Sequence, residues 1–333
     1  MSVRVHRAGI LSTLQDRGRY GYQRFGMPAG GVMDEHSHRL ANLLVGNAEE
    51  EATLEFTLAG PRLEFTDLTL IAICGGDFAP TIGGQEVPVS RPVLVRPGTV
   101  LDLAVCRLGC RAYLAVAGGF DVPVVMGSKS TYLPASIGGF EGRALRRGDE
   151  LPSRRAPATL YPGLHRALQT QEAFACPKWS VHANAALLAH DHHRIRFMQG
   201  RHFALFSESS QAQFVGAEFR IGANSDRMGY RLEGPELTSS EPGEILPEAV
   251  AFGSIQVPPD GKPIVLMANR QTTGGYPLIG EVASVDLPLL AQLPPGDTLR
   301  FEPITLEQSQ QLYLQREREM ALMREGLRER ARQ

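Results

Sequence analysis

The chain has 333 residues, of which 43% are apolar and 21% charged, and 34 Lys and Arg nearly balance 36 Asp and Glu. This composition is typical of a globular protein long enough for two domains, with cores that need neither disulfides nor metals. It excludes the basic surface that nucleic-acid binding requires and a polybasic membrane patch, and no run approaches the roughly 20 apolar residues of a membrane span.

The N-terminal residues place Arg4 and Arg7 before any apolar run can form, so we expect no secretory signal. The cysteines show no CxxC spacing and lie mostly beside strand-like runs, which favours buried free thiols in a reducing compartment. We therefore expect a cytoplasmic protein. The four cysteines are Cys74, Cys106, Cys110 and Cys176.

Short apolar runs separated by turn residues predict a mainly β fold (β-rich α+β) with few helices, because 35 Gly and 23 Pro interrupt the chain. The sequence Pro-Pro-Asp-Gly at 258–261 lies between two such runs and predicts a β-hairpin. The clearest strand-like runs are 68–73, 93–95, 100–105, 112–117 and 264–268.

Two helices are predicted. The first begins after Asp34, a favourable N-cap, and ends at Gly46, a favourable terminator. The second is the C-terminal tail, where Thr305 and Gln308 form a capping box ahead of a broken apolar stripe. The charged face of this tail is either solvated or binds a partner, and both interpretations stay open.

The composition changes between residues 153 and 193, where the periodicity weakens. We interpret 153–193 as a linker between an N-terminal subdomain at 1–152 and a C-terminal subdomain at 194–305, followed by a helical tail at 306–333. Several histidines of the linker lack the spacing and the supporting carboxylate of a zinc site, so no metal is predicted. They are His182, His190, His192 and His193.

Segment 269–277 directly follows an apolar run and combines a guanidinium, an amide, two hydroxyls and a pair of glycines. Such a turn suits a carboxylate, a carboxyphosphate-like anion or an amide carbonyl, because the glycines let a ligand approach backbone N–H groups. The alternative is a polar loop whose side chains cap its own backbone. The candidate residues are Arg270, Gln271, Thr272, Thr273, Gly274, Gly275 and Tyr276.

Three further groups carry polar side chains. Asp226 and Arg227 either orient a ligand or a catalytic water, or form a local ion pair in a turn. A similar Asp-Arg turn precedes a Gly-Tyr pair near residue 16, although two short matches are too few to establish a duplication. A serine separates Gly127 from Lys129, so segment 127–132 fails the phosphate-loop pattern, but it can still line a polar cleft. The remaining candidates are Gln15, Asp16, Arg19, Ser128 and Ser130.

Long motifs in order along the chain resemble the biotin-dependent carboxyltransferase family, whose members are called allophanate hydrolase subunit 2, KipA or the C subunit of 5-oxoprolinase. The motifs are residues 9–22, 30–34, 41–47, 54–61, 113–119, 127–133, 225–229, 253–258 and 269–277. The resemblance implies two subdomains with cyclophilin-like β-barrel architecture. It also implies a KipI-like chain, the B component of such complexes, as partner, together with a third chain, the A component.

In the 5-oxoprolinase system, the resemblance implies ATP-driven opening of the cyclic amide of 5-oxoproline to glutamate. We assign catalytic roles to Arg270, Gln271, Thr272 and Asp226 as hypotheses drawn from side-chain chemistry. Gln256, in the motif at 253–258, joins Arg227 and the other candidates as a substrate-binding residue. ATP would act through the complex, because this chain has no P-loop, and the chain has no biotin-attachment site.

Two other functions are compatible with the resemblance. A KipA-like protein antagonises a KipI-type inhibitor of a histidine kinase, and a urea carboxylase component transfers carboxyl from carboxybiotin to urea or a small amide. The chain also departs from the family. Asn269 replaces a common Asp, Leu278 replaces a common Lys, and Pro247 interrupts a Leu-Ser-Glu-Gly stretch. The substrate therefore stays open.

Overall fold

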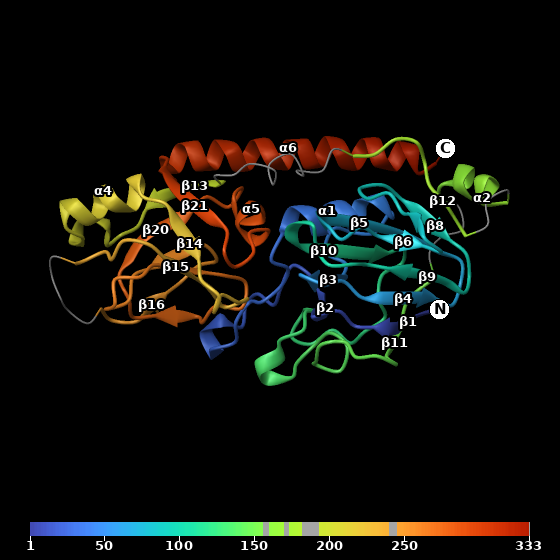
Figure 1. Cartoon of the computed structure of the whole chain (residues 1–333), viewed down its shortest axis with the longest axis horizontal. Helices are drawn as coiled ribbons and strands as arrows, with labels where there is room; N and C mark the ends of the chain where they lie inside the picture. The colour runs from blue at the N-terminus through green and yellow to red at the C-terminus, as the bar shows by residue number, and fades with distance from the viewer. Residues whose placement is uncertain (156–159, 170–172, 182–192, 240–244, 333) are drawn as a thin grey trace. The chain divides into compact units, whose positions relative to one another are not determined.

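A computed structural model describes residues 1–155, 160–169, 173–181, 193–239 and 245–332 (Figure 1). The chain divides into two compact units. The first comprises Met1–Gly18, Asp34–Leu187 and Met320–Gln333, and the second comprises Arg19–Met33 and Leu188–Glu319. Residues 19–33 thus group with the second unit, although the expected N-terminal subdomain ran without interruption from 1 to 152.

The first unit contains two six-stranded sheets. One has the order β11 (Glu150–Pro152), β1 (Ser2–Arg7), β4 (Arg62–Phe65), β9 (Thr99–Asp102), β6 (Thr81–Ile82) and β7 (Gln85–Glu86). The other has the order β12 (Phe174–Ala175), β8 (Val93–Val95), β5 (Thr69–Asp77), β10 (Leu108–Val116), β3 (Thr53–Thr57) and β2 (Leu11–Gln15). Every pairing in both sheets is antiparallel among the described residues.

Side chains from both sheets meet in one core. In β1, Val3 and Val5 are buried while the residues between and after them are more exposed, as expected for a strand with one face on a core. β10 is buried on both faces over most of its length, because helix α1 (Glu35–Leu44) packs against β5 and β10 on the side away from that core (Figure 1). The unit is thus a β-sandwich with helix α1 on one face.

The predicted caps of α1 are confirmed. The Asp34 side chain accepts a hydrogen bond from the backbone N–H of Ser37 at 2.9 Å and one from its hydroxyl at 2.7 Å. Gly46 has a φ of +76°, and its N–H donates to the Leu43 carbonyl, which ends the helix where the glycine was expected to end it.

The stretch predicted as a linker, 153–193, contains regular structure. Helix α2 (Pro162–Leu168) is followed by β12, which pairs with β8 at the edge of a six-stranded sheet. The described residues 160–169 and 173–175 of the expected linker thus group with the first unit. A two-residue edge strand is too short to show a periodic pattern, so the sequence did not predict it. His182, His190 and His192 lie outside the described residues.

The second unit is a closed barrel (Figure 1). Its strand order is β13 (His193–Gln199), β20 (Leu278–Val282), β17 (Ser254–Gln256), β18 (Ile264–Leu266), β15 (Gly229–Glu233), β14 (Phe219–Ile221) and β21 (Thr298–Pro303). Among its described residues are helices α4 (Glu208–Gly216) and α5 (Leu287–Ala291). The mainly β fold and a barrel were predicted and are confirmed, but the strands of the first unit form the two sheets instead of a second closed barrel.

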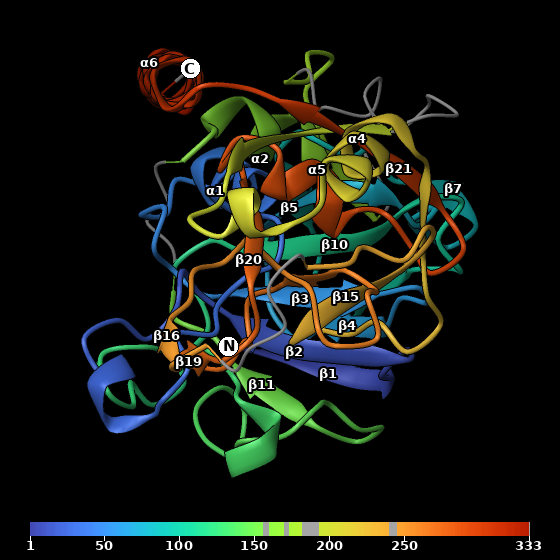
Figure 2. The ribbon, with the colours of Figure 1, turned by 90° about the vertical axis from the view of Figure 1, so that its left-hand side faces the viewer.

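Local signals in the second unit also proved reliable. The predicted hairpin is confirmed, since β17 pairs antiparallel with β18 across the turn at 258–261. Phenylalanines fill the barrel, and Phe214 stacks on Phe301 with ring centroids 4.5 Å apart. Aromatic pairs of this kind each contribute about 1 kcal/mol beyond the area they bury. A short ribbon of β16 (Glu248–Ala249) and β19 (Thr273–Gly274) accompanies the barrel (Figure 2).

The C-terminal helix, α6 (Leu306–Arg330), begins at the predicted capping box. The Thr305 N–H donates to Gln308 Oε1 at 2.8 Å, and the Gln308 N–H donates to Thr305 Oγ1 at 3.2 Å. In the first unit, Arg324 of this helix forms an ion pair with the buried Glu49, which also pairs with Arg39. The described residues also include the short 3₁₀ helices η1 (Gln23–Phe25), η2 (Leu133–Ala135) and η3 (Phe203–Leu205).

None of the helices in the described part of the chain combines the length and the apolar character needed to cross a bilayer.

Candidate functional site

The loop predicted to carry the chemistry, 269–277, lies at the end of β18 in the second unit. The chain turns back tightly there, because the Arg270 N–H donates to the Met267 carbonyl at 3.1 Å. Thr273 and Gly274 form β19 and pair with Ala249 and Glu248 of β16. A polar segment directly after a buried strand is thus held on a rigid scaffold, as binding loops commonly are.

Arg270 is the most distinctive side chain of this loop. Its Nε donates to the Val250 carbonyl at 3.2 Å, and its guanidinium forms no ion pair with a described acidic residue. Burial lowers the pKa of Arg270 from its ordinary value, and the neighbouring Tyr20 opposes this shift. Arg270 nevertheless stays protonated, because arginine has so high an ordinary pKa. A half-buried cation without an anionic partner is suited to bind an anionic ligand.

Gln256 and Gln271 form a second polar contact beneath the same loop. Gln271 Nε2 donates to Gln256 Oε1 at 3.2 Å, and Gln256 Nε2 donates to the Tyr276 carbonyl at 3.3 Å. Gln256 is only 2% exposed, so both ends of its amide are used to fix the loop. A Cβ atom on Gly274 would lie 2.3 Å from Gln256 Nε2, which explains why this position requires a glycine.

The Asp226–Arg227 turn lies beside this loop, since the Asn269 N–H donates to the Arg227 carbonyl at 2.7 Å. Asp226 is exposed, and its Oδ1 accepts from the backbone N–H groups of Met228 at 2.7 Å and Gly229 at 3.3 Å. The carboxylate therefore caps its own turn. Its proposed role of orienting a water stays a prediction.

Arg227 is buried and donates to the Gly31 carbonyl, which ties segment 19–33 to the loop within the second unit. Arg19, 1% exposed, belongs to this segment, and its N–H donates to the Ala29 carbonyl at 2.6 Å. Asn269 Oδ1 is buried without a hydrogen-bond partner among the described residues. A buried amide oxygen of this kind is available to accept a hydrogen bond from a ligand.

The remaining predicted residues form a separate cluster in the first unit. The carboxylate of Asp16 accepts hydrogen bonds from the hydroxyls of Ser128 and Ser130, each at 2.6 Å, and from the Lys129 and Gly18 backbone N–H groups. Gln15 Nε2 donates to the Thr131 carbonyl at 3.1 Å. These hydrogen bonds hold segment 128–131 against the strand end that carries Asp16, whereas Gln15 Oε1 is buried without a hydrogen-bond partner among the described residues.

Tyr20 lies within the motif at 9–22, but the sequence did not identify it as a site residue. In the structure it lies near Arg270 and is therefore a further candidate of this site. Leu278, where the resemblance implies a Lys, is 3% exposed and belongs to an apolar cluster with Val250 and Leu266. No group of three or more His, Cys, Asp or Glu side chains in the described ranges is arranged to hold a metal ion.

Comparisons with known proteins agree with this architecture. A family model described as "Carboxyltransferase domain, subdomain A and B" matches residues 25–303. The chain is 37% identical over 302 residues to the C subunit of 5-oxoprolinase from Haemophilus influenzae, a match that covers 90% of this chain and 91% of that protein. It is 36% identical to the C subunit of 5-oxoprolinase from Escherichia coli, covering 92% of this chain and 93% of that protein.

Among solved structures, the crystal structure of Kluyveromyces lactis urea carboxylase matches with a TM-score of 0.84 and 31% identity. The match covers 96% of this chain but 29% of that protein. The likeness therefore concerns one part of a much larger enzyme.

Proposed function

The chain belongs to the carboxyltransferase domain family with subdomains A and B, and on this basis we propose that it is the C-type component of an ATP-dependent 5-oxoprolinase. Relatives with that name align with it over about nine-tenths of both chains, so the resemblance extends well beyond one shared domain. The substrate would be a cyclic amide, and the partners would be the KipI-like B component and the A component.

The single observation that carries this proposal is the Arg270 guanidinium, which forms no ion pair with an acidic residue in the described part of the chain. A half-buried Arg with no described acidic partner is costly unless a ligand supplies the anion. 5-Oxoproline carries a carboxylate next to its cyclic amide, and phosphorylation of the amide oxygen adds further negative charge. Both groups suit a guanidinium that can donate two parallel hydrogen bonds.

The proposed reaction consumes one ATP and two waters and gives glutamate, ADP and phosphate. Transfer of the terminal phosphoryl group to the amide oxygen would weaken the resonance that stabilises the amide. Water would then add to the ring carbon, and the C–N bond would break as the nitrogen takes up a proton, which leaves an acyl phosphate. A second water would hydrolyse this acyl phosphate to the carboxylate of glutamate and free phosphate. Within this chain, Arg270 would hold the anion while Gln271 and Thr272 hydrogen-bond the amide group.

Substitution of Arg270 tests the assignment directly. In the complex reconstituted with the A and B components, Arg270→Gln should lower kcat/KM for 5-oxoproline by about 10- to 150-fold, the range expected for losing a hydrogen bond to a charged group. Arg220→Gln is the matched control, because Arg220 is an exposed arginine on β14 of the same unit. Equal turnover in the Arg270→Gln and Arg220→Gln complexes would remove Arg270 from the site.

A second candidate is the transfer of a carboxyl group from carboxybiotin to urea or another small amide. The structural match to urea carboxylase favours it. This function requires a biotinylated partner, which the 5-oxoprolinase reaction does not. Carboxylation of urea by the chain in the presence of carboxybiotin, with no glutamate formed from 5-oxoproline, would identify this candidate. Antagonism of a KipI-type inhibitor stays a prediction, and the absence of turnover in either assay would favour it.

A further inference from the structure

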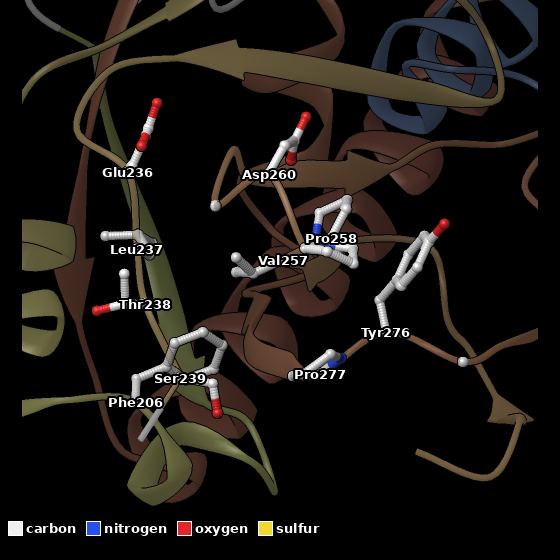
Figure 3. Close-up of a pocket in the computed structure, with 13 residues that line it drawn as sticks. Phe206, Glu236, Leu237, Thr238, Ser239, Val257, Pro258, Asp260, Tyr276 and Pro277 are labelled. Atoms are coloured by element: carbon white, nitrogen blue, oxygen red, sulfur yellow. The ribbon is translucent and has the colours of Figure 1, made fainter. Parts of the chain in front are cut away.

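A cavity of about 610 Å³ opens in the second unit, and it shares Gly275 and Tyr276 with the Arg270 loop. Its wall combines Phe206 with residues 236–239, 257–261 and 275–277, which lie far apart along the chain. We call it the Tyr276 pocket, after the aromatic residue at its side (Figure 3). Its volume is within the range typical of sites for small molecules.

The inner part of the Tyr276 pocket is apolar. Phe206, Leu237 and Val257 line it and are between 2% and 4% exposed, so their side chains form a fixed floor rather than mobile surface groups. Pro258 and Pro277 add rigid apolar walls. The backbone is equally well fixed, because the Val257 N–H donates to the Pro277 carbonyl at 3.0 Å. An apolar group that enters the pocket therefore meets a preformed surface.

Two exposed carboxylates, those of Glu236 and Asp260, line the same end of this pocket. In Figure 3 both lie at that end, with Ser239 and Phe206 at the other end. Their chain segments are joined by a hydrogen bond of 2.9 Å from the Leu237 N–H to the Gly261 carbonyl. Neither carboxylate forms an ion pair with a described basic residue, and Asp260 accepts only from the backbone N–H of Lys262. Two negative charges thus stand unneutralised above an apolar floor.

We propose that the Tyr276 pocket binds an alkylammonium group, with the hydrocarbon stem on the apolar floor and the positive end between Glu236 and Asp260. A neutral apolar ligand would make no favourable electrostatic interaction with the two carboxylates, and an anionic ligand would be repelled by them. The same chemistry is present in a free aliphatic amine and in the side chain of lysine, whose stem and charged end have this arrangement. This site lies beyond the proposed hydrolase function and does not depend on it.

The site also adjoins the Arg270 loop within the second unit. Tyr276, whose carbonyl accepts from Gln256, belongs to both, and Val257 follows Gln256 directly in the chain. An occupant of the Tyr276 pocket would contact the backbone that fixes the loop. A ligand in the Tyr276 pocket would therefore influence the conformation of the Arg270 loop.

Titration of the full chain with primary alkylammonium ions tests the proposal, monitored through the methyl NMR resonances of Leu237 and Val257. Affinity should rise by about fourfold for each methylene from butylammonium to hexylammonium, as burial of hydrocarbon predicts. Hexanoate is the matched anionic probe and should bind at least about tenfold more weakly than hexylammonium. Equal binding of hexanoate and hexylammonium would overturn the proposal.

Two variants locate the charge requirement. The double variant Glu236→Gln with Asp260→Asn should weaken hexylammonium binding by at least about tenfold, since both changes keep shape and remove charge. Glu233→Gln, an exposed acid of β15 that does not line the pocket, should leave binding unchanged. Unchanged binding in the double variant, with its NMR spectrum showing a native fold, would contradict the assignment.

A further binding experiment distinguishes a free amine from a lysine side chain of a protein partner. An N-acetylated, C-amidated peptide with one central lysine is compared with hexylammonium on the same resonances. Tighter binding of the peptide identifies a lysine of a protein partner, and tighter binding of the free amine identifies a small molecule. Failure of both to bind would overturn the proposal while leaving the turnover assays of the hydrolase function untouched.

Discussion

At the scale of single residues, two Asp-Arg turns use the same chemistry for support. The Oδ1 atoms of Asp16 and Asp226 each accept from the backbone N–H two residues ahead, at 2.9 Å in Gly18 and 2.7 Å in Met228. Such Asx turns fix the backbone without help from distant residues. The resemblance between the two sequences is therefore explained by local geometry, whether or not the units share an origin.

Asp16 does more than close its turn, and its removal should be costly. Asp16→Ala leaves two buried hydroxyls and the Lys129 N–H without their acceptor, so we expect the free energy of unfolding to fall by about 3 kcal/mol. Urea denaturation followed by circular dichroism measures this change. Asp121→Ala, at an exposed acid of the same unit, should cost less than about 0.5 kcal/mol. A shared unfolding midpoint for the two variants would show that the Asp16 network is dispensable.

Gly274 should be intolerant of any side chain. A Cβ on Gly274 would collide with Gln256, whereas a Cβ on Gly216, at the end of α4 in the same unit, would meet no atom within 4 Å. Gly274→Ala should therefore displace Gln256, release Gln271 and lower kcat at least about tenfold, since small misplacements of binding groups are costly. Gly216→Ala is the matched control and should stay within about twofold. Steady-state kinetics of the reconstituted complex decide, and equal losses would refute the positioning role of Gln256.

At the scale of elements, the sequence predicted helix ends correctly where hydrogen bonds within one turn determine them. The caps at Asp34 and at Thr305 with Gln308 were predicted and are confirmed, because a capping side chain bonds to N–H groups within its own turn. The short edge strand β12 was missed, since its partner β8 lies about eighty residues away in sequence. The Tyr276 pocket was missed for the same reason, because four distant segments form it.

Helix α1 also carries a buried titratable group with a measurable consequence. His38 packs against β3, where its Nδ1 lies 2.8 Å from Thr53 Oγ1, and burial lowers its pKa to about 4 in spite of the opposing effect of Asp16. In the unfolded chain His38 would titrate near its ordinary pKa of about 6.5. The unfolded state therefore binds the proton first as the pH falls, and the fold loses stability between about pH 6.5 and pH 4.

Comparison with His38→Gln isolates this effect. Between pH 7.5 and pH 4.5 the unsubstituted protein should lose about 3 kcal/mol more of its free energy of unfolding than the variant, as two to three pKa units imply. Glutamine can keep the hydrogen bond to Thr53 but does not titrate. Urea denaturation series at several pH values provide the measurement. If the free energy of unfolding changes equally with pH in the two proteins, His38 binds a proton as readily in the folded state as in the unfolded state, which would contradict the account.

At the scale of the whole molecule, the chain does not divide into units at a single boundary. Residues 19–33 group with the second unit, and residues 320–333 group with the first, where Arg324 pairs with Glu49. Sequence patterns predict only contiguous domains, so they could not show that these two segments group with the other unit. The predicted site residues consequently fall into two clusters. The Arg270 loop, Gln256, Arg227 and Arg19 belong to the second unit, and Asp16 with Ser128 and Ser130 belongs to the first.

Family membership follows from matches over most of the chain, whereas the substrate depends on a few residues that differ from the family. Asn269 is buried with an unpartnered oxygen, and Leu278 is buried in an apolar cluster. The resemblance implies an Asp and a Lys at these two positions, so neither side chain carries the charge that the resemblance implies. The proposed activity on a cyclic amide would therefore rely on Arg270 and the neutral groups around it. An assay of glutamate release examines this directly.

The most direct test is ATP-dependent release of glutamate from 5-oxoproline by this chain assembled with the KipI-like B component and the A component of the same organism. We predict turnover that disappears when this chain is omitted and returns when it is added back. The complete 5-oxoprolinase of Escherichia coli serves as the positive control. A stably assembled complex that releases no glutamate under conditions where the control is active would contradict the proposed function.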